Sequence, residues 1–165
     1  MTRSQSMDLA SAAKDAIPAD LPLYSRFVQR LHRRYADVLP LLPPGNPNRN
    51  TLNVGYSALK ATGLDTSAAL RVLRQLTLER LAQLDCTLQA SLDQVTRGMT
   101  WLAEVTLDIA WQQVVADLDA LHGAPTKANG QRAEMWIVGM GKLGARESLT
   151  SVSYTHLTLP TICSV

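Results

Sequence analysis

EMWIVGMGKLGARE, at residues 134–147, is the stretch that decides how the fold is interpreted. It begins with a short apolar run at residues 135–138, which is typical of a buried strand. Three glycines and a lysine follow directly: Gly139, Gly141, Lys142 and Gly144. Glycines let a backbone turn sharply and bring its N–H groups close to an anion, and lysine adds a positive point charge. The pattern predicts a strand followed by a phosphate-binding loop made of these four residues.

The glycine spacing is compatible with more than one class of protein. It matches G-x-G-x-x-G, the dinucleotide-binding pattern, but not the Walker pattern, because Lys142 does not directly follow the last glycine. An NAD-type protein would also need an acidic residue about 20 positions further on, and no Asp or Glu follows Glu147. Two other interpretations stay open: a nucleotide-handling loop, and a plain connector in a non-enzymatic helical interaction module.

The longer string GMGKLGARE resembles the start of the nucleotidyltransferase motif in the bifunctional glutamine synthetase adenylyltransferase/adenylyl-removing enzymes. In that family the motif continues as Leu-Asn-x-Ser-Ser-Asp-x-Asp-Leu, and its two aspartates hold catalytic magnesium. Ser153 and Thr155 stand where these aspartates should fall. The resemblance implies Mg²⁺ and ATP or ADP as cofactors of the intact enzyme. It supports no cofactor, metal ligand or catalytic residue in this chain alone.

The resemblance covers residues 64–147 and implies both a fold and a function. The expected fold is mainly α: a helical region, then the first strand and glycine loop of an incomplete α/β nucleotidyltransferase domain of the polymerase-beta type. The implied partners are glutamine synthetase, which gains or loses AMP, and a signalling protein of the PII type. A weaker similarity at residues 24–42 favours the N-terminal, adenylyl-removing half. We expect the chain as written to be an inactive fragment.

The sequence divides into four parts. Residues 1–19 are small and polar and are expected to be disordered or frayed, and residues 20–123 form the helical region. Residues 133–147 begin the nucleotidyltransferase domain. Residues 148–165 contain no Lys, Arg, Asp or Glu, and they resemble translated sequencing-adaptor read-through. We therefore expect this tail to be non-native.

Capping residues and apolar spacing predict helices at about 20–38, 51–62, 66–85 and 92–121. Their expected N-terminal caps are Asp20, Asp65 and a Ser91–Gln94 capping box. The helix at 66–85 resembles an arginine-rich helix of the family through Arg71, Arg74 and Arg80. The apolar side of the last helix is expected to be buried along its length: Leu92, Val95, Met99, Leu102, Ile109, Leu118 and Leu121.

Charge and composition narrow the function further. A net charge of +2 over 165 residues does not indicate a large nucleic-acid footprint. No long apolar run or signal peptide is present in the sequence, so we expect a cytoplasmic chain without a membrane partner. Glu104 and Asp108 lie four residues apart and share a helical face, which we interpret as solvated. Gly98 is expected to weaken its helix by up to about 1 kcal/mol.

Overall fold

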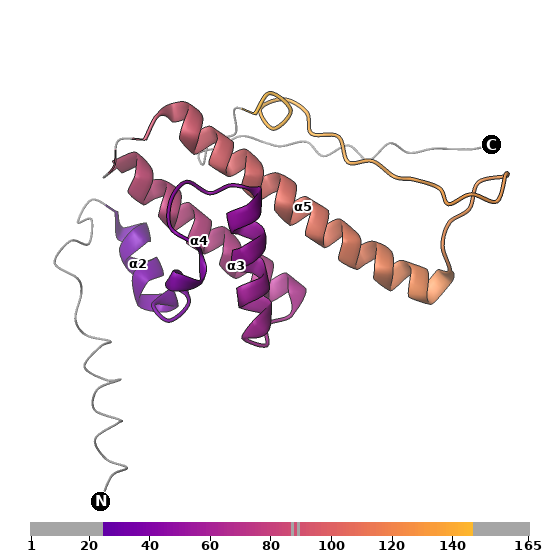
Figure 1. Cartoon of the computed structure of the whole chain (residues 1–165), viewed down its shortest axis with the longest axis horizontal. Helices are drawn as coiled ribbons and strands as arrows, with labels where there is room; N and C mark the ends of the chain where they lie inside the picture. The colour runs from indigo at the N-terminus through magenta and orange to yellow at the C-terminus, as the bar shows by residue number, and fades with distance from the viewer. Residues whose placement is uncertain (1–24, 87, 89, 147–165) are drawn as a thin grey trace, which may run out of the picture.

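A computed structural model describes residues 25–86, 88 and 90–146. It contains four α-helices and one short 3₁₀ helix: α2 (Arg26–Tyr35), η1 (Leu39–Leu41), α3 (Arg49–Ala61), α4 (Thr66–Cys86) and α5 (Leu92–His122) (Figure 1). The prediction of a mainly α fold is confirmed. Within these residues there is no β-strand, and residues 133–137 have no regular secondary structure. The strand expected at 135–138 is therefore not observed, and within this segment only Val138 lies at an isolated β-bridge.

The core lies where α3, α4 and α5 meet, with α4 in contact with the other three helices. Its central side chains are almost completely buried leucines and one valine: Leu52, Leu59, Leu73, Leu76, Leu102 and Val105. Burial of each such side chain contributes about 1.5–3 kcal/mol. The side of α4 that faces this core carries Leu73, Leu76 and Leu81, all almost completely buried. The helical bundle is thus held by one leucine-rich core.

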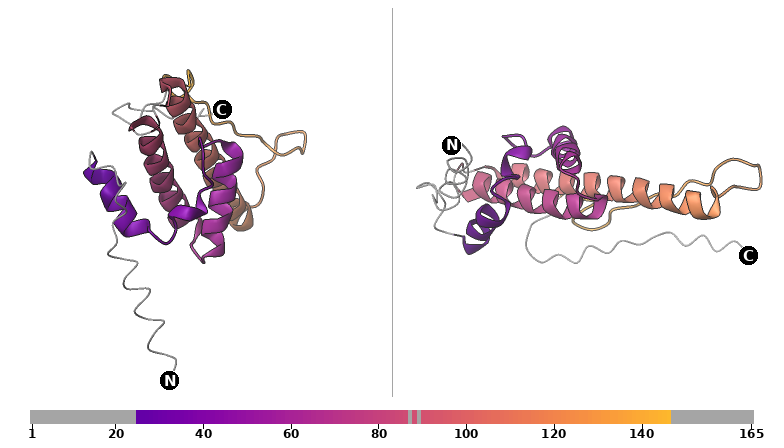
Figure 2. Two further views of the ribbon diagram at one scale, coloured as in Figure 1. Left: turned by 60° about the vertical axis from the view of Figure 1, so that its left-hand side comes forward. Right: turned by 90° about the horizontal axis from the view of Figure 1, so that it is seen from below.

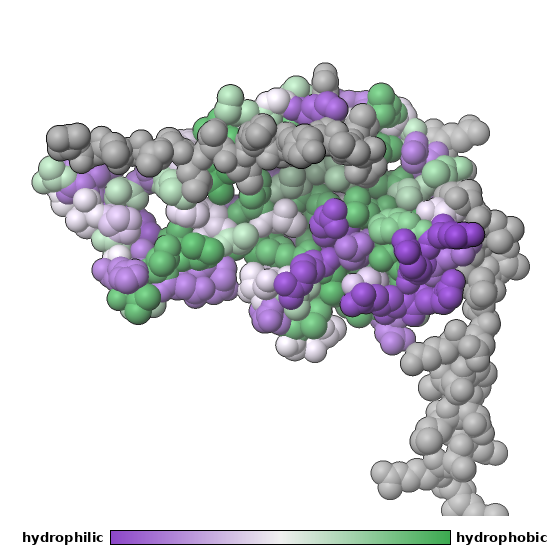
Figure 3. Space-filling model, turned by 180° about the vertical axis from the view of Figure 1, so that it is seen from behind, coloured by the Kyte–Doolittle hydropathy of each residue, from purple (hydrophilic) through white to green (hydrophobic). Residues whose placement is uncertain are grey.

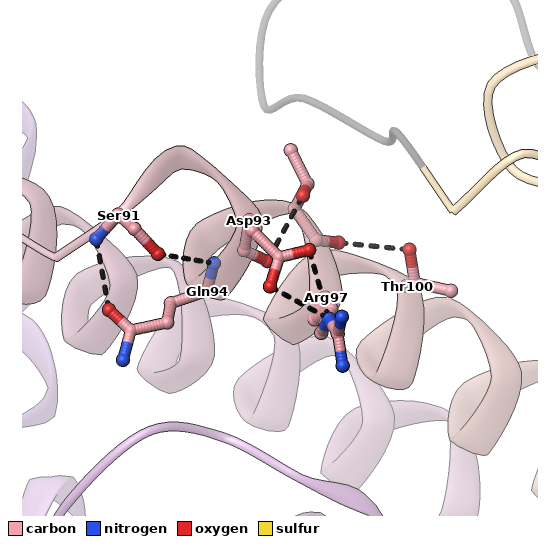
Figure 4. A network of polar contacts seen from close by, with 6 residues as sticks. Ser91, Asp93, Gln94, Arg97 and Thr100 are labelled. Carbon is pink, nitrogen blue, oxygen red and sulfur yellow. Dashed lines mark hydrogen bonds and ion pairs between the residues drawn. The ribbon is translucent and has the colours of Figure 1, made fainter.

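The bounds of α4 and α5 agree with the sequence predictions within one residue. The Asp65 carboxylate accepts a hydrogen bond of 2.6 Å from the Ala68 N–H at the start of α4. The Ser91 hydroxyl accepts from the Gln94 N–H, and the Gln94 side chain accepts from the Ser91 N–H, as Figure 4 shows. This reciprocal pair is the expected capping box. It supplies acceptors for backbone N–H groups at the start of α5 that have no partner within the helix.

Gly98 has a packing role that the sequence analysis missed. A Cβ added to Gly98 would lie 2.6 Å from Cδ2 of Leu81, which is 1% exposed on α4. The missing side chain therefore lets α4 and α5 approach closely. The prediction that Gly98 only weakens its helix was incomplete, because it left out this close contact between the two helices.

The C-terminal half of α5 extends beyond the other helices, as the right-hand view of Figure 2 shows. Leu118 and Leu121 are 49% and 73% exposed, and Leu92 at the other end is 68% exposed. The prediction of a buried apolar side along the whole helix was wrong at these three leucines. Their spacing is correct, but no described element covers them.

The first described helix starts later than predicted. Ser25 is its N-cap, with extended backbone and a hydroxyl that accepts a hydrogen bond from the Val28 N–H. A helix running through from about residue 20 is therefore wrong, and the expected cap Asp20 lies outside the described residues. His32 on α2 contacts Glu79 on α4, with 2.7 Å between Nε2 and Oε1. This contact joins α2 to the core helix through a carboxylate that is almost fully buried.

The outer side of α2 is strongly hydrophilic. Figure 3 shows hydrophilic side chains gathered at the end of the molecule that carries this helix. Four arginines of α2 are exposed: Arg26, Arg30, Arg33 and Arg34. These arginines are exposed to solvent, as residues on the polar side of an amphipathic helix should be.

After α5 the chain turns back along the helix (Figure 1). Gly123 has a φ of 79° and ends the helix. An antiparallel bridge joins Thr126 to Arg132 in the returning segment. Arg132 then forms an ion pair with Asp119 of α5, with 2.7 Å between nitrogen and oxygen. These contacts bring residues 135–146 alongside the middle of α5.

Candidate functional site

The glycine loop closes on itself through its own backbone. The Ala145 N–H donates to the Gly141 carbonyl at 2.9 Å, and the Arg146 N–H donates to the Leu143 carbonyl at 3.2 Å. Gly141 has a φ of 60°, a conformation that side chains disfavour. These bonds fold residues 141–146 into consecutive turns rather than a regular helix.

Gly144 is needed for a close approach between backbone segments. A Cβ added there would lie 2.5 Å from the carbonyl oxygen of Gly139, so no larger residue fits without moving the main chain. A Cβ on Gly139 would lie 3.1 Å from Cγ of Leu143. The loop therefore uses its glycines for its own closure, and this geometry by itself does not require a ligand.

The loop is docked on α5. The Leu143 side chain is only 9% exposed. The Arg146 guanidinium carbon lies 6.0 Å from the centre of the Trp101 ring, and that of Arg49 lies 5.5 Å from it. Such cation–π contacts are worth about 0.5–1 kcal/mol at exposed sites. Arg49 also contacts Glu104 with 3.0 Å between nitrogen and oxygen, so α3, α5 and the loop meet at Trp101.

A pocket of about 520 Å³ lies beside this docking point. Its walls come from the start of α3, the middle of α5 and the segment 135–146. The lining combines charged, aromatic and apolar residues: Arg49, Glu104, Leu107, Asp108, Trp111, Met135, Trp136, Ile137, Gly139, Leu143, Gly144 and Arg146. The pocket therefore offers two guanidinium groups, two carboxylates and two indoles to a ligand.

The structure brings together only part of the predicted loop site. Gly139 and Gly144 line the pocket, whereas Gly141 and Lys142 do not and are exposed. Glu104 and Asp108 do share one face of α5, as predicted, but they face the pocket. The interpretation of that face as simply solvated was incomplete, because Glu104 also pairs with Arg49.

Three residues of the site were missed by the sequence analysis: Arg49, Trp101 and Arg146. Arg49 and Glu104 are 55 positions apart, and no local pattern could pair them. Trp101 lies on α5, and its contacts with Arg49 and Arg146 depend on the same long-range packing. Arg146 stands within the quoted glycine-loop motif, so its charge beside the loop was the one available signal.

The described residues do not form a metal site. Across residues 25–86, 88 and 90–146, no group of three His, Cys, Asp or Glu side chains lies together where it could hold a metal ion. Ser153 and Thr155, at the positions expected for the family's aspartates, lie outside the described residues.

The fold and the site define a helical protein that carries a glycine-rich loop above an open, charged pocket. The chain belongs to the glutamate-ammonia ligase adenylyltransferase family, whose profile matches residues 21–153. The family resemblance drawn from the glycine-loop motif is thus confirmed. The match starts well before residue 64 and ends after residue 147, so it is longer than the motifs indicated.

Curated relatives carry the name bifunctional glutamine synthetase adenylyltransferase/adenylyl-removing enzyme. The protein of Ralstonia nicotianae is 35% identical over 133 residues, which is 75% of this chain and 14% of the relative. That of Bordetella pertussis is 44% identical over 79 residues, covering 47% of this chain and 8% of the relative. The chain therefore spans a small part of the length of these relatives. No solved structure matches the chain.

None of the helices in the described part of the chain is long and apolar enough to cross a membrane.

Proposed function

We propose that this chain is a segment of an enzyme that adds AMP to glutamine synthetase and removes it, and that its glycine loop handles a nucleotide phosphate. The observation that carries the proposal is the family match across the loop, at residues 21–153. The geometry supports it, because Gly139, Gly144 and Arg146 line one pocket. Backbone N–H groups of a glycine loop and a nearby guanidinium are suited to bind phosphate oxygens.

We propose further that the segment comes from the adenylyl-removing half. In that reaction an oxygen of inorganic phosphate attacks the phosphorus of the tyrosine-bound AMP. The bond between phosphorus and the tyrosine oxygen breaks, the tyrosine oxygen takes up a proton, and ADP leaves. Catalysis of such a transfer depends on positioning and on neutralising charge around phosphorus. In this segment the loop and its pocket would contribute the positioning.

The chain alone is proposed to be inactive. A catalytic site of this kind uses carboxylates to hold Mg²⁺ on the transferred group, and Ser153 and Thr155 stand where the two aspartates of the family motif would fall. Mg²⁺, ATP and ADP, together with a PII-type signalling partner, belong to the proposal for the longer enzyme.

A phosphorolysis assay tests the activity proposal. Radiolabelled, adenylylated glutamine synthetase is incubated with phosphate, Mg²⁺ and either this chain or the Ralstonia nicotianae relative. We expect labelled ADP from the relative and none from the chain. Magnesium-dependent release by the chain above the blank would refute its inactivity.

Equilibrium dialysis of the chain with ATP, ADP and NAD separates the classes of function. Preferential binding of ADP or ATP supports the nucleotide-handling loop. Preferential binding of NAD would instead favour a dinucleotide-binding protein. Binding of none of the three would favour a helical interaction module and would refute nucleotide handling by this loop.

A further inference from the structure

We infer that Arg146, and not Lys142, is the cation of the glycine loop that binds the phosphates of a nucleoside polyphosphate. The inference rests on the proposed function and assigns its ligand-binding residue. Both side chains are exposed, but Arg146 lines the pocket between the loop and α5 and Lys142 does not.

The backbone of Arg146 is the first independent observation. Its φ is 59°, and no other non-glycine residue in the described ranges has a positive φ. Glycine adopts this conformation without strain, and an arginine does so only at a cost. A strained backbone of this kind is often maintained where the side chain serves a ligand site. The loop thus keeps a long cationic side chain at a position that favours glycine.

The surroundings of the guanidinium are the second observation. It lies 6.0 Å from the centre of the Trp101 ring, which gives the planar group a surface to stack on. Within the described ranges no carboxylate forms an ion pair with Arg146, whereas Arg49, the other pocket guanidinium, is paired with Glu104 at 3.0 Å. Arg146 therefore has N–H donors available for an anion, and Arg49 is already neutralised.

The rest of the pocket indicates the class of ligand. Gly139 and Gly144 line it beside Arg146, so phosphate oxygens would find backbone and guanidinium donors together. Trp111 and Trp136 line the same pocket, and Trp136 is 70% exposed. An indole surface favours an aromatic base. A nucleoside polyphosphate has both groups, whereas pyrophosphate has only the phosphates.

Isothermal titration calorimetry of the full 165-residue chain tests the inference, with ADP and with pyrophosphate as the probes. Removal of a charged hydrogen-bonding partner typically weakens binding by about 10- to 100-fold. We expect this loss of ADP affinity for Arg146→Ala. Arg146→Lys should lose only part of the affinity, because it keeps the positive charge but not the planar set of N–H donors. Lys142→Ala is the matched control in the same loop and should stay within about 2-fold of the unaltered chain.

Arg146→Gly separates a structural role from a binding role. It removes the side chain and its contact with the Trp101 ring but also relieves the positive φ of 59°, so the loop should stay about as well ordered, by amide exchange, as in the unaltered chain. We nevertheless expect it to lose ADP affinity as Arg146→Ala does. Unaltered ADP binding in Arg146→Gly would overturn the assignment.

The remaining outcomes distinguish the inference from the proposed function. Loss of binding in Lys142→Ala but not in Arg146→Ala overturns the inference and leaves a nucleotide-handling loop. No ADP binding by the unaltered chain overturns both. Pyrophosphate binding as tight as ADP binding overturns the part assigned to the indoles and leaves a phosphate site.

Discussion

Replacing Gly144 with alanine should release the glycine loop from α5 and leave the helical bundle folded. The added Cβ would lie 2.5 Å from the Gly139 carbonyl oxygen. Because that oxygen belongs to the backbone, the clash cannot be relieved by a side-chain rotation. Opening the loop exposes Leu143, at a cost of about 2 kcal/mol. It also breaks the two loop hydrogen bonds, at about 1 kcal/mol each. We therefore expect the free energy of loop docking to fall by up to about 4 kcal/mol. The conformational entropy that the released chain regains makes the net loss smaller.

Amide hydrogen exchange measured by NMR detects this change at Ala145 and Arg146, whose N–H groups donate the two loop bonds. Exchange there should accelerate by about tenfold or more, since a factor of ten corresponds to about 1.4 kcal/mol. The free energy of urea unfolding should fall by no more than this loss of docking free energy, and the helical bundle should stay folded, because Leu143 lies outside the core cluster.

Two other loop variants serve as controls for this prediction. Gly141→Ala meets no atom within 4 Å but strains a φ of +60°, so it should cost about 1 kcal/mol. Lys142→Ala, at an exposed position, should change nothing. Unaltered exchange at Ala145 and Arg146 in Gly144→Ala would refute the reasoning, since it would mean that Gly139 and Gly144 are not packed against each other.

Two further predictions concern the helical bundle and are measured by urea unfolding. His32→Ala leaves the nearly buried Glu79 carboxylate without its 2.7 Å partner, which should lower the free energy of unfolding by about 1–3 kcal/mol. The exposed control Arg33→Ala should lower it by less than about 0.5 kcal/mol. Equal stability of the two variants would argue against the α2–α4 contact. Gly98→Ala gains about 1 kcal/mol of helix propensity but overpacks Leu81 at about 1–3 kcal/mol. The net result should be a loss of up to about 2 kcal/mol, and a gain in stability would contradict the close approach of α4 and α5.

The helices were predictable where their signals are local. Asp65 and the Ser91–Gln94 pair bind backbone groups only three residues away, so their sequence positions fix the starts of α4 and α5. The start of α2 was misplaced, because Asp20 and Ser25 are both acceptable caps and sequence alone does not rank them. The exposure of Leu118 and Leu121 was not predictable, because periodicity identifies an apolar face but not the element that covers it.

The site was only partly predictable for the same reason. The glycines of the loop are a local signal, and Gly141 and Gly144 do occupy positions that disfavour a side chain. The partner surface is not local: Trp101 lies far from Arg146 in sequence, and a fold is needed to bring them together. Sequence shows that Lys142 and Arg146 are both charged, but it does not show that only Arg146 lines the pocket.

A titration of isotopically labelled chain with ADP, followed by NMR, tests most directly whether the glycine loop and α5 form one nucleotide pocket. We predict chemical-shift changes at the Gly139, Gly144 and Arg146 amides and at the Trp111 indole N–H, with the α2 amides unaffected. No shifts at saturating ADP, or shifts confined to the exposed arginines of α2, would contradict the account.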